Sequence, residues 1–390
     1  MAGLVSLDLS GNGIHDISAL SKLKNLRYLD LANNNITSAL PLSCLGELEE
    51  LDLSGNDILP QYMPGSAFYA DYVPDDTGAP TPELLTNGEM IVDGSTDIVL
   101  FGPGELSALT DSDIDSINSC GSLKEFRLEG ADGGDLNVLP MFDNMETLKL
   151  TGCEETDLSV LTNIGSLRRL ELSECGSVHD LSCLAGCNGL RSLTVEDCKG
   201  IDDRSIEDIS RIASLEELSL NETDILYTDI ITNITPLGRL SSLRSLRLCS
   251  IYGVDDISVI AKLPKLEELY LNSVRIHDAS CIASMTGLKR LEITGCWDSD
   301  IKDLSFLSGL DDLEYLYISE MDVAEISPVA ELDGLRELIL QDLPINDISP
   351  LFDVKQLRRL EIKGCGGIYG QIGELYEALP DCEIVRKDST

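Results

Sequence analysis

Cysteines are the first side chains in this sequence that suggest chemistry, because thiolates bind zinc and attack electrophiles. Cys175, Cys183 and Cys187 lie near one another, but they lack the paired C-x-x-C spacing of a zinc site, and no histidine lies at a matching position. Several cysteines instead share one place in a repeated pattern with several asparagines: Cys153, Cys175, Cys198, Cys296 and Cys365, with Asn12, Asn34 and Asn56. We therefore expect buried thiols that bond weakly to turn backbone, and we predict no metal and no cofactor.

The three histidines also share one place in the pattern, in "IHDIS" at His15, "VHDLS" at His179 and "IHDAS" at His277. A residue that recurs with a repeat serves the architecture, so none of them is singled out as an acid–base catalyst. The sequence has no Gly-rich phosphate loop and no activated cysteine. We therefore predict that the protein is not an enzyme, with catalysis by carboxylates alone as a remote alternative.

Aspartates recur as well, and most of them have a structural explanation. "DSDIDS" at 111–116 begins like a calcium loop but lacks glycine at the sixth place and glutamate at the twelfth, so we expect it to open a helix. Other aspartates precede an apolar residue that is nearly always followed by serine: Asp16, Asp157, Asp256, Asp278, Asp303 and Asp347. Short acidic side chains at such places cap turns or helical starts.

The elements that hold these residues come from a repeated "LxxLxL" pattern, which starts at Leu4, Leu26 and Leu48 and resumes after a break. There are about fifteen copies, most of about 22 residues. The alternation in "LEELDL" predicts a short strand whose leucines point inward. In the first copy, Ile14, Ile17, Leu20 and Leu23 follow at three-residue spacing, which favours a 3₁₀-like or extended return path.

The stretches "LDLSGNGIHDISALSKL" and "LILQDLPINDISPLFDV" resemble the leucine-rich repeat family, and the period and the "DIS" step resemble its bacterial internalin class. The resemblance implies an α/β fold: a curved, right-handed solenoid of about 14–15 repeats with a parallel β-sheet on its concave face. The convex side would be 3₁₀, short helical or irregular. The resemblance further implies a non-catalytic protein that binds a partner protein on the concave face.

We expect a single solenoid domain over 1–390, since stacked repeats share one core. The third copy is longer than the others and predicts a loop insertion at 59–94. The residues 366–390 read as a closing helix, strand and polar tail, which we interpret as a C-terminal cap and tail. The first copy begins at Leu4 with nothing before it to cover its apolar end. We expect an upstream segment, a partner or self-association to protect that edge.

The formal charge of −41, from 69 acidic and 28 basic residues, argues against nucleic acid as a partner and disfavours anionic membranes. No apolar run is long enough for membrane insertion. By our alignment, the exposed strand face is nearly balanced, at about −4, and the rest of the chain carries about −37. The charge therefore favours solubility and the exclusion of wrong partners over specific recognition.

The strand face itself contains aromatic and basic residues of the kind found in protein interfaces. The candidate partner-binding residues on it are Arg247, Tyr270, Arg290, Tyr315, Tyr317 and Ile339, and the insertion adds Tyr69 and Tyr72 as a second contact. Ordinary solvent-facing strand residues of high β-propensity would give the same pattern. The function is then that of a surface or secreted adhesin-like module, or alternatively of an intracellular regulatory subunit or inhibitor of an enzyme.

No single feature of the sequence decides where the protein is located. The start of the chain lacks a secretory signal, which predicts a cytoplasmic protein as the chain stands, or an extracellular or cell-surface one if the chain is a fragment. Free thiols favour a reducing compartment, whereas the repeat class favours the cell surface.

Overall fold

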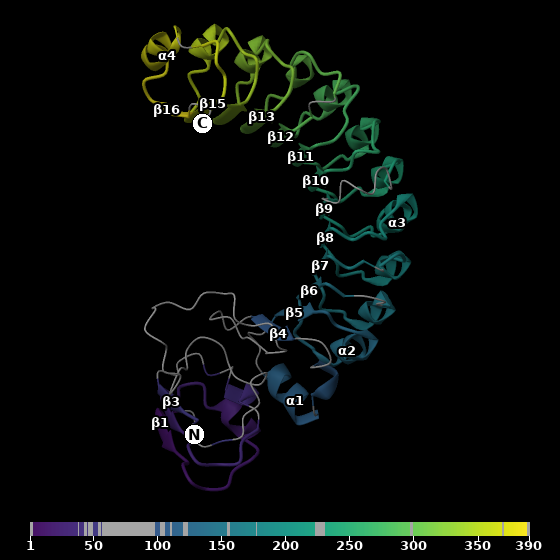
Figure 1. Ribbon diagram of the computed structural model, residues 1–390, viewed down its shortest axis with the longest axis vertical. Coiled ribbons are helices and arrows are strands. Elements are labelled where there is room, and N and C mark those ends of the chain that lie inside the picture. Colours follow the sequence, from purple (N-terminus) through teal and green to yellow (C-terminus); the bar gives the residue numbers. More distant parts are fainter. Residues whose placement is uncertain are drawn as a thin grey trace. The chain divides into compact units, whose positions relative to one another are not determined.

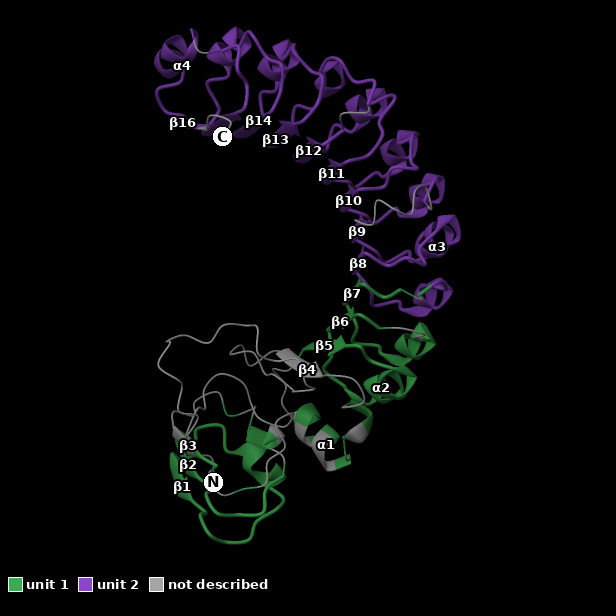
Figure 2. Ribbon diagram, viewed as in Figure 1, with its two compact units in different colours: residues 1–178 green, residues 179–390 purple. Residues whose placement is uncertain are grey.

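The computed structural model describes residues 3–37, 39–42, 45, 50–53, 56, 98–101, 106–109, 111–119, 124–153, 157–176, 178–222, 231–296, 299–368 and 370–387. The predicted insertion at 59–94, with Tyr69 and Tyr72, lies outside these residues. The chain divides into two compact units, 1–178 and 179–390 (Figure 2). The single domain predicted for 1–390 stays a prediction.

The first unit contains two sets of parallel strands. Strands β1 (Ser6–Asp8), β2 (Tyr28–Asp30) and β3 (Glu50–Asp52) form a three-stranded sheet in chain order. Strands β4 (Ile98–Phe101), β5 (Glu125–Glu129), β6 (Thr147–Thr151) and β7 (Arg169–Ser173) pair in parallel, each with the next. The return segments contain 3₁₀ helices η1 (Ser18–Lys22), η2 (Leu40–Leu42), η5 (Leu106–Ala108), η6 (Leu139–Met141) and η7 (Leu158–Asn163), and α-helices α1 (Asp111–Ser119) and α2 (Gly133–Val138).

The second unit repeats one strand and one return turn. Its parallel strands are β8 (Ser192–Glu196), β9 (Glu217–Asn221), β10 (Ser245–Cys249), β11 (Glu268–Asn272), β12 (Arg290–Thr294), β13 (Tyr315–Ser319), β14 (Glu337–Gln341), β15 (Arg359–Lys363) and β16 (Glu383–Lys387). Its helices are η8 (Ser182–Gly186), α3 (Asp203–Ile209), η9 (Thr235–Arg239), η10 (Ser258–Lys262), η11 (Ser280–Ser284), η12 (Ser305–Leu307), η13 (Ser327–Glu331), η14 (Ser349–Asp353) and α4 (Ile372–Ala378). Within this unit the strands line one face and the helical turns the opposite one (Figure 1).

The leucines of each copy build the core between these two faces. Leu246, Leu269 and Leu291 lie side by side in register on neighbouring strands, and none of them is exposed. On the return path of the first copy, η1 buries Leu20 and the residue before the helix, Ile17, is buried as well. The predicted strands and 3₁₀ returns are therefore confirmed. Removing one such leucine side chain typically costs about 2–5 kcal/mol.

The shared asparagine and cysteine position forms a ladder of hydrogen bonds to turn backbone. Asn34 Nδ2 donates to the carbonyl of Leu9, 25 residues earlier, at 3.0 Å. Cys175 Sγ makes the equivalent contact to the carbonyl of Leu150, also 25 residues earlier, at 3.5 Å. Burial raises the pKa of the Cys296 thiol in the same position to about 11. The thiols thus replace the asparagines structurally, as predicted.

The predicted aspartate caps are also in place. Each carboxylate accepts a hydrogen bond from the backbone N–H two residues later, at 2.8–2.9 Å, in Asp16, Asp157, Asp256, Asp278, Asp303 and Asp347. The "DSDIDS" stretch lies in α1, which confirms the expected helix. In 366–390, α4 precedes β16, and β16 pairs in parallel with β15.

Candidate partner-binding surface

Two arginines and two tyrosines form a stack across strands β10 to β13. Alternation along each strand places them on the face opposite the leucine core. Strand register sets Arg247 beside Tyr270 and Arg290 beside Tyr315. The guanidinium carbon of Arg247 lies 3.9 Å from the ring centroid of Tyr270, and that of Arg290 lies 3.5 Å from the ring centroid of Tyr315 and 6.0 Å from that of Tyr270. We call these four residues the arginine–tyrosine cluster.

Hydrogen bonds hold two members of the cluster, Tyr270 and Arg290. The hydroxyl of Tyr270 donates to Oε2 of Glu268 at 3.0 Å, and the same oxygen accepts from Ser245 Oγ at 3.1 Å. Arg290 donates to Oε1 of Glu292 at 3.3 Å. Each of these contacts is of a kind worth about 0.5–1.5 kcal/mol. The cluster is therefore a preorganised surface.

The tyrosines of the cluster do not titrate near neutral pH. Burial raises the pKa of Tyr270 and that of Tyr315 to about 12 in each case. The two rings differ in accessibility, because Tyr270 is only 9% exposed whereas Tyr315 is half-buried. The expectation of an exposed Tyr270 is wrong, since the guanidinium group of Arg247 lies against its ring and that of Arg290 lies nearby on the next strand.

An apolar extension continues the cluster onto the next strand. Tyr317 lies beside Ile339 in the register of β13 and β14, and both are half-buried. The hydroxyl of Tyr317 donates to Oε1 of Gln341 at 3.1 Å. The predicted partner-binding residues of the strand face therefore lie together over β10 to β14. That they bind a partner stays a prediction.

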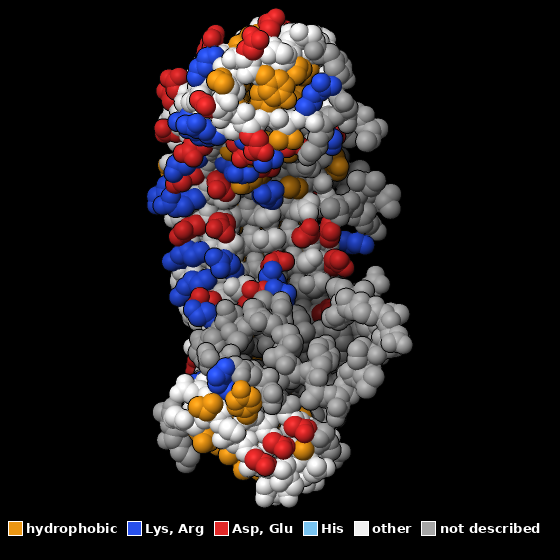
Figure 3. All heavy atoms as spheres, turned by 90° about the vertical axis from the view of Figure 1, so that its left-hand side faces the viewer, with side chains coloured by type: hydrophobic (Ala, Val, Ile, Leu, Met, Phe, Trp, Pro, Cys, Tyr) orange, Lys and Arg blue, Asp and Glu red, His pale blue; other side chains and the backbone are white. Residues whose placement is uncertain are grey.

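The charges on this face are interspersed. Figure 3 shows basic and acidic side chains next to one another over the described strands of the second unit. Arg290 pairs with Glu292, and Arg359 with Glu337 and Glu361. Arg247 is exposed, and no described carboxylate lies within 4 Å of its guanidinium group. Its described neighbours are the ring of Tyr270 and the thiol of Cys249.

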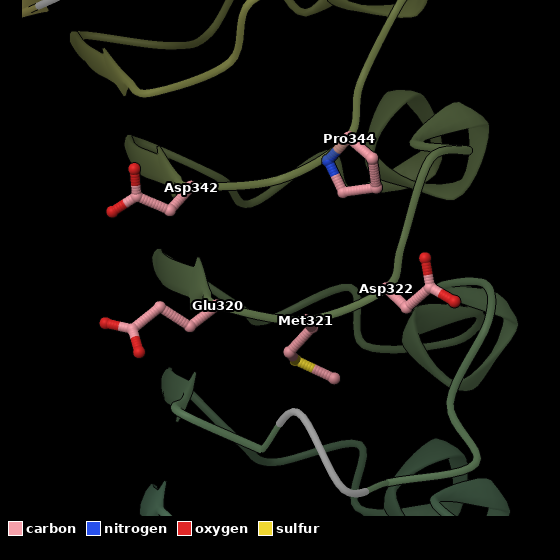
Figure 4. Close-up of a pocket in the computed structure, with 5 residues that line it drawn as sticks. All are labelled: Glu320, Met321, Asp322, Asp342 and Pro344. Atoms are coloured by element: carbon pink, nitrogen blue, oxygen red, sulfur yellow. The ribbon is translucent and has the colours of Figure 1, made fainter. Parts of the chain in front are cut away.

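An open recess of about 370 Å³ lies beside the ends of β13 and β14, and the sequence did not predict it. It is lined by Glu320, Met321, Asp322, Asp342 and Pro344. In Figure 4, the carboxylates of Glu320 and Asp342 point outward together, away from Met321 and Pro344. Asp322 already accepts a hydrogen bond from the Lys302 ammonium group at 2.8 Å. Within the described ranges, no group of three His, Cys, Asp or Glu residues could hold a metal ion.

Comparison with protein families supports the presence of leucine-rich repeats. A family profile described as leucine-rich repeats in two copies matches residues 3–44 and 24–61. The copies that follow have the same strand and return turn. The chain therefore contains leucine-rich repeats and has a leucine-rich repeat fold. No curated protein matches it significantly.

Several solved structures are similar to this leucine-rich repeat protein. An internalin from Listeria monocytogenes is 21% identical over 99% of this chain and 87% of its own, with a TM-score of 0.48. A leucine-rich repeat protein from Leptospira interrogans is 17% identical over 98% of this chain and 96% of its own, with a TM-score of 0.49. The TLR13–ssRNA13 complex gives 19% identity over 99% of this chain and 64% of that chain, with a TM-score of 0.54. This last match supports the leucine-rich repeat fold.

Leucine-rich repeat proteins are in general protein-binding scaffolds, and they are typically not enzymes. No helix in the described part of this one combines the length and the apolar character needed to cross a membrane.

Proposed function

We propose that this leucine-rich repeat protein is a non-catalytic interaction module that binds a partner protein on the strand face of β10 to β14. The supporting observation is the arginine–tyrosine cluster with its apolar extension, Tyr317 and Ile339. Tyrosine and arginine dominate interface hot spots because they bury a large area and also offer hydrogen bonds. A rigid surface also loses little conformational entropy when a partner binds.

The setting of this function is either a cell surface, where the module is adhesin-like, or a cell interior, where it regulates or inhibits an enzyme. Both settings use the same strand face. The identity of the protein that binds to the face separates them: a surface protein of another cell favours the first, and an enzyme favours the second.

The test is affinity capture from lysate and culture supernatant with the full chain and two variants. Tyr315→Asp with Tyr317→Asp replaces two half-buried rings of the proposed surface by carboxylates. Tyr376→Asp is the matched control, because Tyr376 is 51% exposed and lies on α4. Tyr270 is unsuitable for this purpose, since its burial couples it to stability.

We expect the wild type and Tyr376→Asp to retain the same protein, and the double variant to bind it at least tenfold more weakly in calorimetry with the purified partner. Thermal melting should show that all three chains are folded. Equal affinity of the double variant and the wild type would place the binding surface elsewhere.

A further inference from the structure

Arg247 differs from Arg290 and Arg359, the other arginines within strands β8 to β15. Arg290 and Arg359 are neutralised by carboxylates at 3.2–3.3 Å. Arg247 instead stacks on Tyr270 and is exposed. A guanidinium group that lies over an aromatic ring keeps its N–H donors at its edge, in the fork geometry that matches a carboxylate. Tyr270 is itself held by Glu268, so this fork is fixed before any ligand arrives.

The surroundings of Arg247 leave room for a ligand. Ser219 lies directly beside it on β9, and Ser245 precedes it by two residues on the same face of β10. Both side chains are small and half-buried. Cys249 lies two residues further along β10, where burial raises the pKa of its thiol and both the charge of Arg247 and a hydrogen bond with Arg247 oppose that rise. No bulky side chain of these neighbouring positions covers the fork.

The acids near Arg247 limit what the ligand can be. Glu268 and Glu292 are engaged by Tyr270 and Arg290, and Glu217 is exposed on β9. Further carboxylates on a ligand would be repelled by these three and by the charge of the whole chain. The ligand therefore has one carboxylate in an otherwise neutral or basic segment.

The apolar extension lies at a fixed span from Arg247. Tyr317 is three strands away, on β13, and Ile339 is four strands away, on β14. Neighbouring strands are about 4.8 Å apart, so the span is about 14–19 Å. An extended chain covers about 3.3–3.6 Å per residue, so the span corresponds to about four to six residues.

We propose that the partner presents an extended segment with one Asp or Glu that pairs with Arg247 and an apolar side chain four to six residues away that packs on Tyr317 and Ile339. This inference rests on the proposed function and specifies its partner. The segment crosses β10 to β14 roughly perpendicular to the strands.

The test is selection of a phage-displayed library of random 12-residue peptides on the immobilised full chain. Enriched peptides are then synthesised, and their affinities are measured by fluorescence anisotropy against the wild type, Arg247→Gln and Arg358→Gln. Arg358→Gln is the matched control, because it removes the same charge from an exposed residue outside the cluster. Arg247→Lys keeps the charge but removes the fork.

We expect the enriched peptides to share one acidic residue and an apolar residue at the stated spacing. Arg247→Gln should weaken binding at least tenfold, Arg247→Lys by a smaller factor, and Arg358→Gln by less than twofold. Replacing the peptide's Asp by Asn should weaken binding to the wild type by the same factor and have no effect on Arg247→Gln.

Three results would overturn the inference: no enrichment above the bare surface, enriched peptides without an acidic residue, or equal binding by Arg247→Gln and Arg358→Gln. The proposed function has its own readout in the capture experiment. Arg247→Gln is therefore added to the capture experiment: if it retains the captured protein as the wild type does, whereas Tyr315→Asp with Tyr317→Asp does not, the proposed function stands and this inference fails.

Discussion

The sheet β1 to β3 and the strands β10 to β13 place side chains at the same positions of the repeat, but those side chains have different partners. Asp8 and Asp30 accept hydrogen bonds at 2.9 Å from the backbone N–H groups of Ser10 and Ala32, in their own turns. Arg247 and Tyr270, at the equivalent place, contact each other across strands. The repeat therefore fixes where a side chain lies, and the side chain decides whether it supports a turn or forms a surface.

The largest effect should come from the turn support of the first region. Asn34 is 7% exposed; its Oδ1 accepts from the N–H groups of Asn12 and Ile14, and its Nδ2 donates to the carbonyls of Leu9 and Leu31. Asn34→Ala leaves these groups without that partner, so we expect a loss of about 2–4 kcal/mol in local stability. Amide hydrogen exchange of Asn12 and Ile14 measures it.

Cys175→Ala is the control for this substitution, because the thiol makes weaker contacts in the same place. We expect it to cost about 1–2 kcal/mol, with the loss confined to the backbone around Leu150 and Ser173. An equal or larger loss for Cys175→Ala than for Asn34→Ala would contradict the idea that asparagine is the stronger turn support.

The next effect concerns the surface of the second region. Tyr270→Ala removes the ring against which Arg247 lies, together with a hydrogen bond to Glu268. We expect a loss of about 1–3 kcal/mol in the free energy of unfolding, measured by urea denaturation. Tyr376→Ala on α4, where the ring is 51% exposed, should change stability by less than about 0.5 kcal/mol. If both substitutions cost the same, the stack contributes nothing.

Much of this comparison could be predicted from the sequence, because it depends on periodic positions. The leucine spacing predicts strands, return turns and the shared Asn and Cys ladder, and it assigns Arg247 and Tyr315 to one face. The burial of Tyr270 could not be predicted, since it depends on side chains of two neighbouring strands. The recess at Glu320 and Asp342 could not be predicted, since both have left-handed backbone, at φ of +54° and +51°, at a position where some copies have glycine and others do not.

Substitutions at this left-handed position should change the free energy of unfolding by smaller amounts, with opposite signs for a change to glycine and a change from glycine. Glu320 lies where Gly152 lies in the first unit, one residue past its strand, and a side chain there strains the backbone. Glu320→Gly should stabilise the protein by about 0.5–1 kcal/mol. Thermal melting and urea denaturation measure the change.

Gly152→Ala is the reverse experiment in the other unit. An added Cβ at Gly152 would meet no atom within 4 Å, so its cost comes from the backbone at φ of +63°. We expect a destabilisation of about 1 kcal/mol. The same sign of effect for Glu320→Gly and Gly152→Ala would refute the strain argument.

The smallest effect per residue should come from the capping aspartates, which make the free energy of unfolding depend on pH in both regions. Hydrogen bonds from the serines two residues later hold the pKa of Asp16 in the first region, and those of Asp256 and Asp278 in the second, below their usual value. A lowered pKa contributes stability that is complete above the unfolded-state value of about 4 and is lost as pH falls through the folded-state value. Urea denaturation between pH 7 and pH 2 should therefore show a plateau and then a decline below about pH 4.

Asp278→Asn keeps the hydrogen-bond acceptor and removes the titration, so the variant should show a shallower decline than the wild type. The arginine–tyrosine cluster should behave differently, because the pKa of each of its tyrosines is raised to about 12 and arginine stays charged. Peptide binding at Arg247 should then be constant between pH 6 and pH 9 and weaken only when the peptide's carboxylate is protonated. A change in peptide affinity between pH 6 and pH 9 would mean that a group outside the cluster, such as a histidine of the turns, takes part in binding.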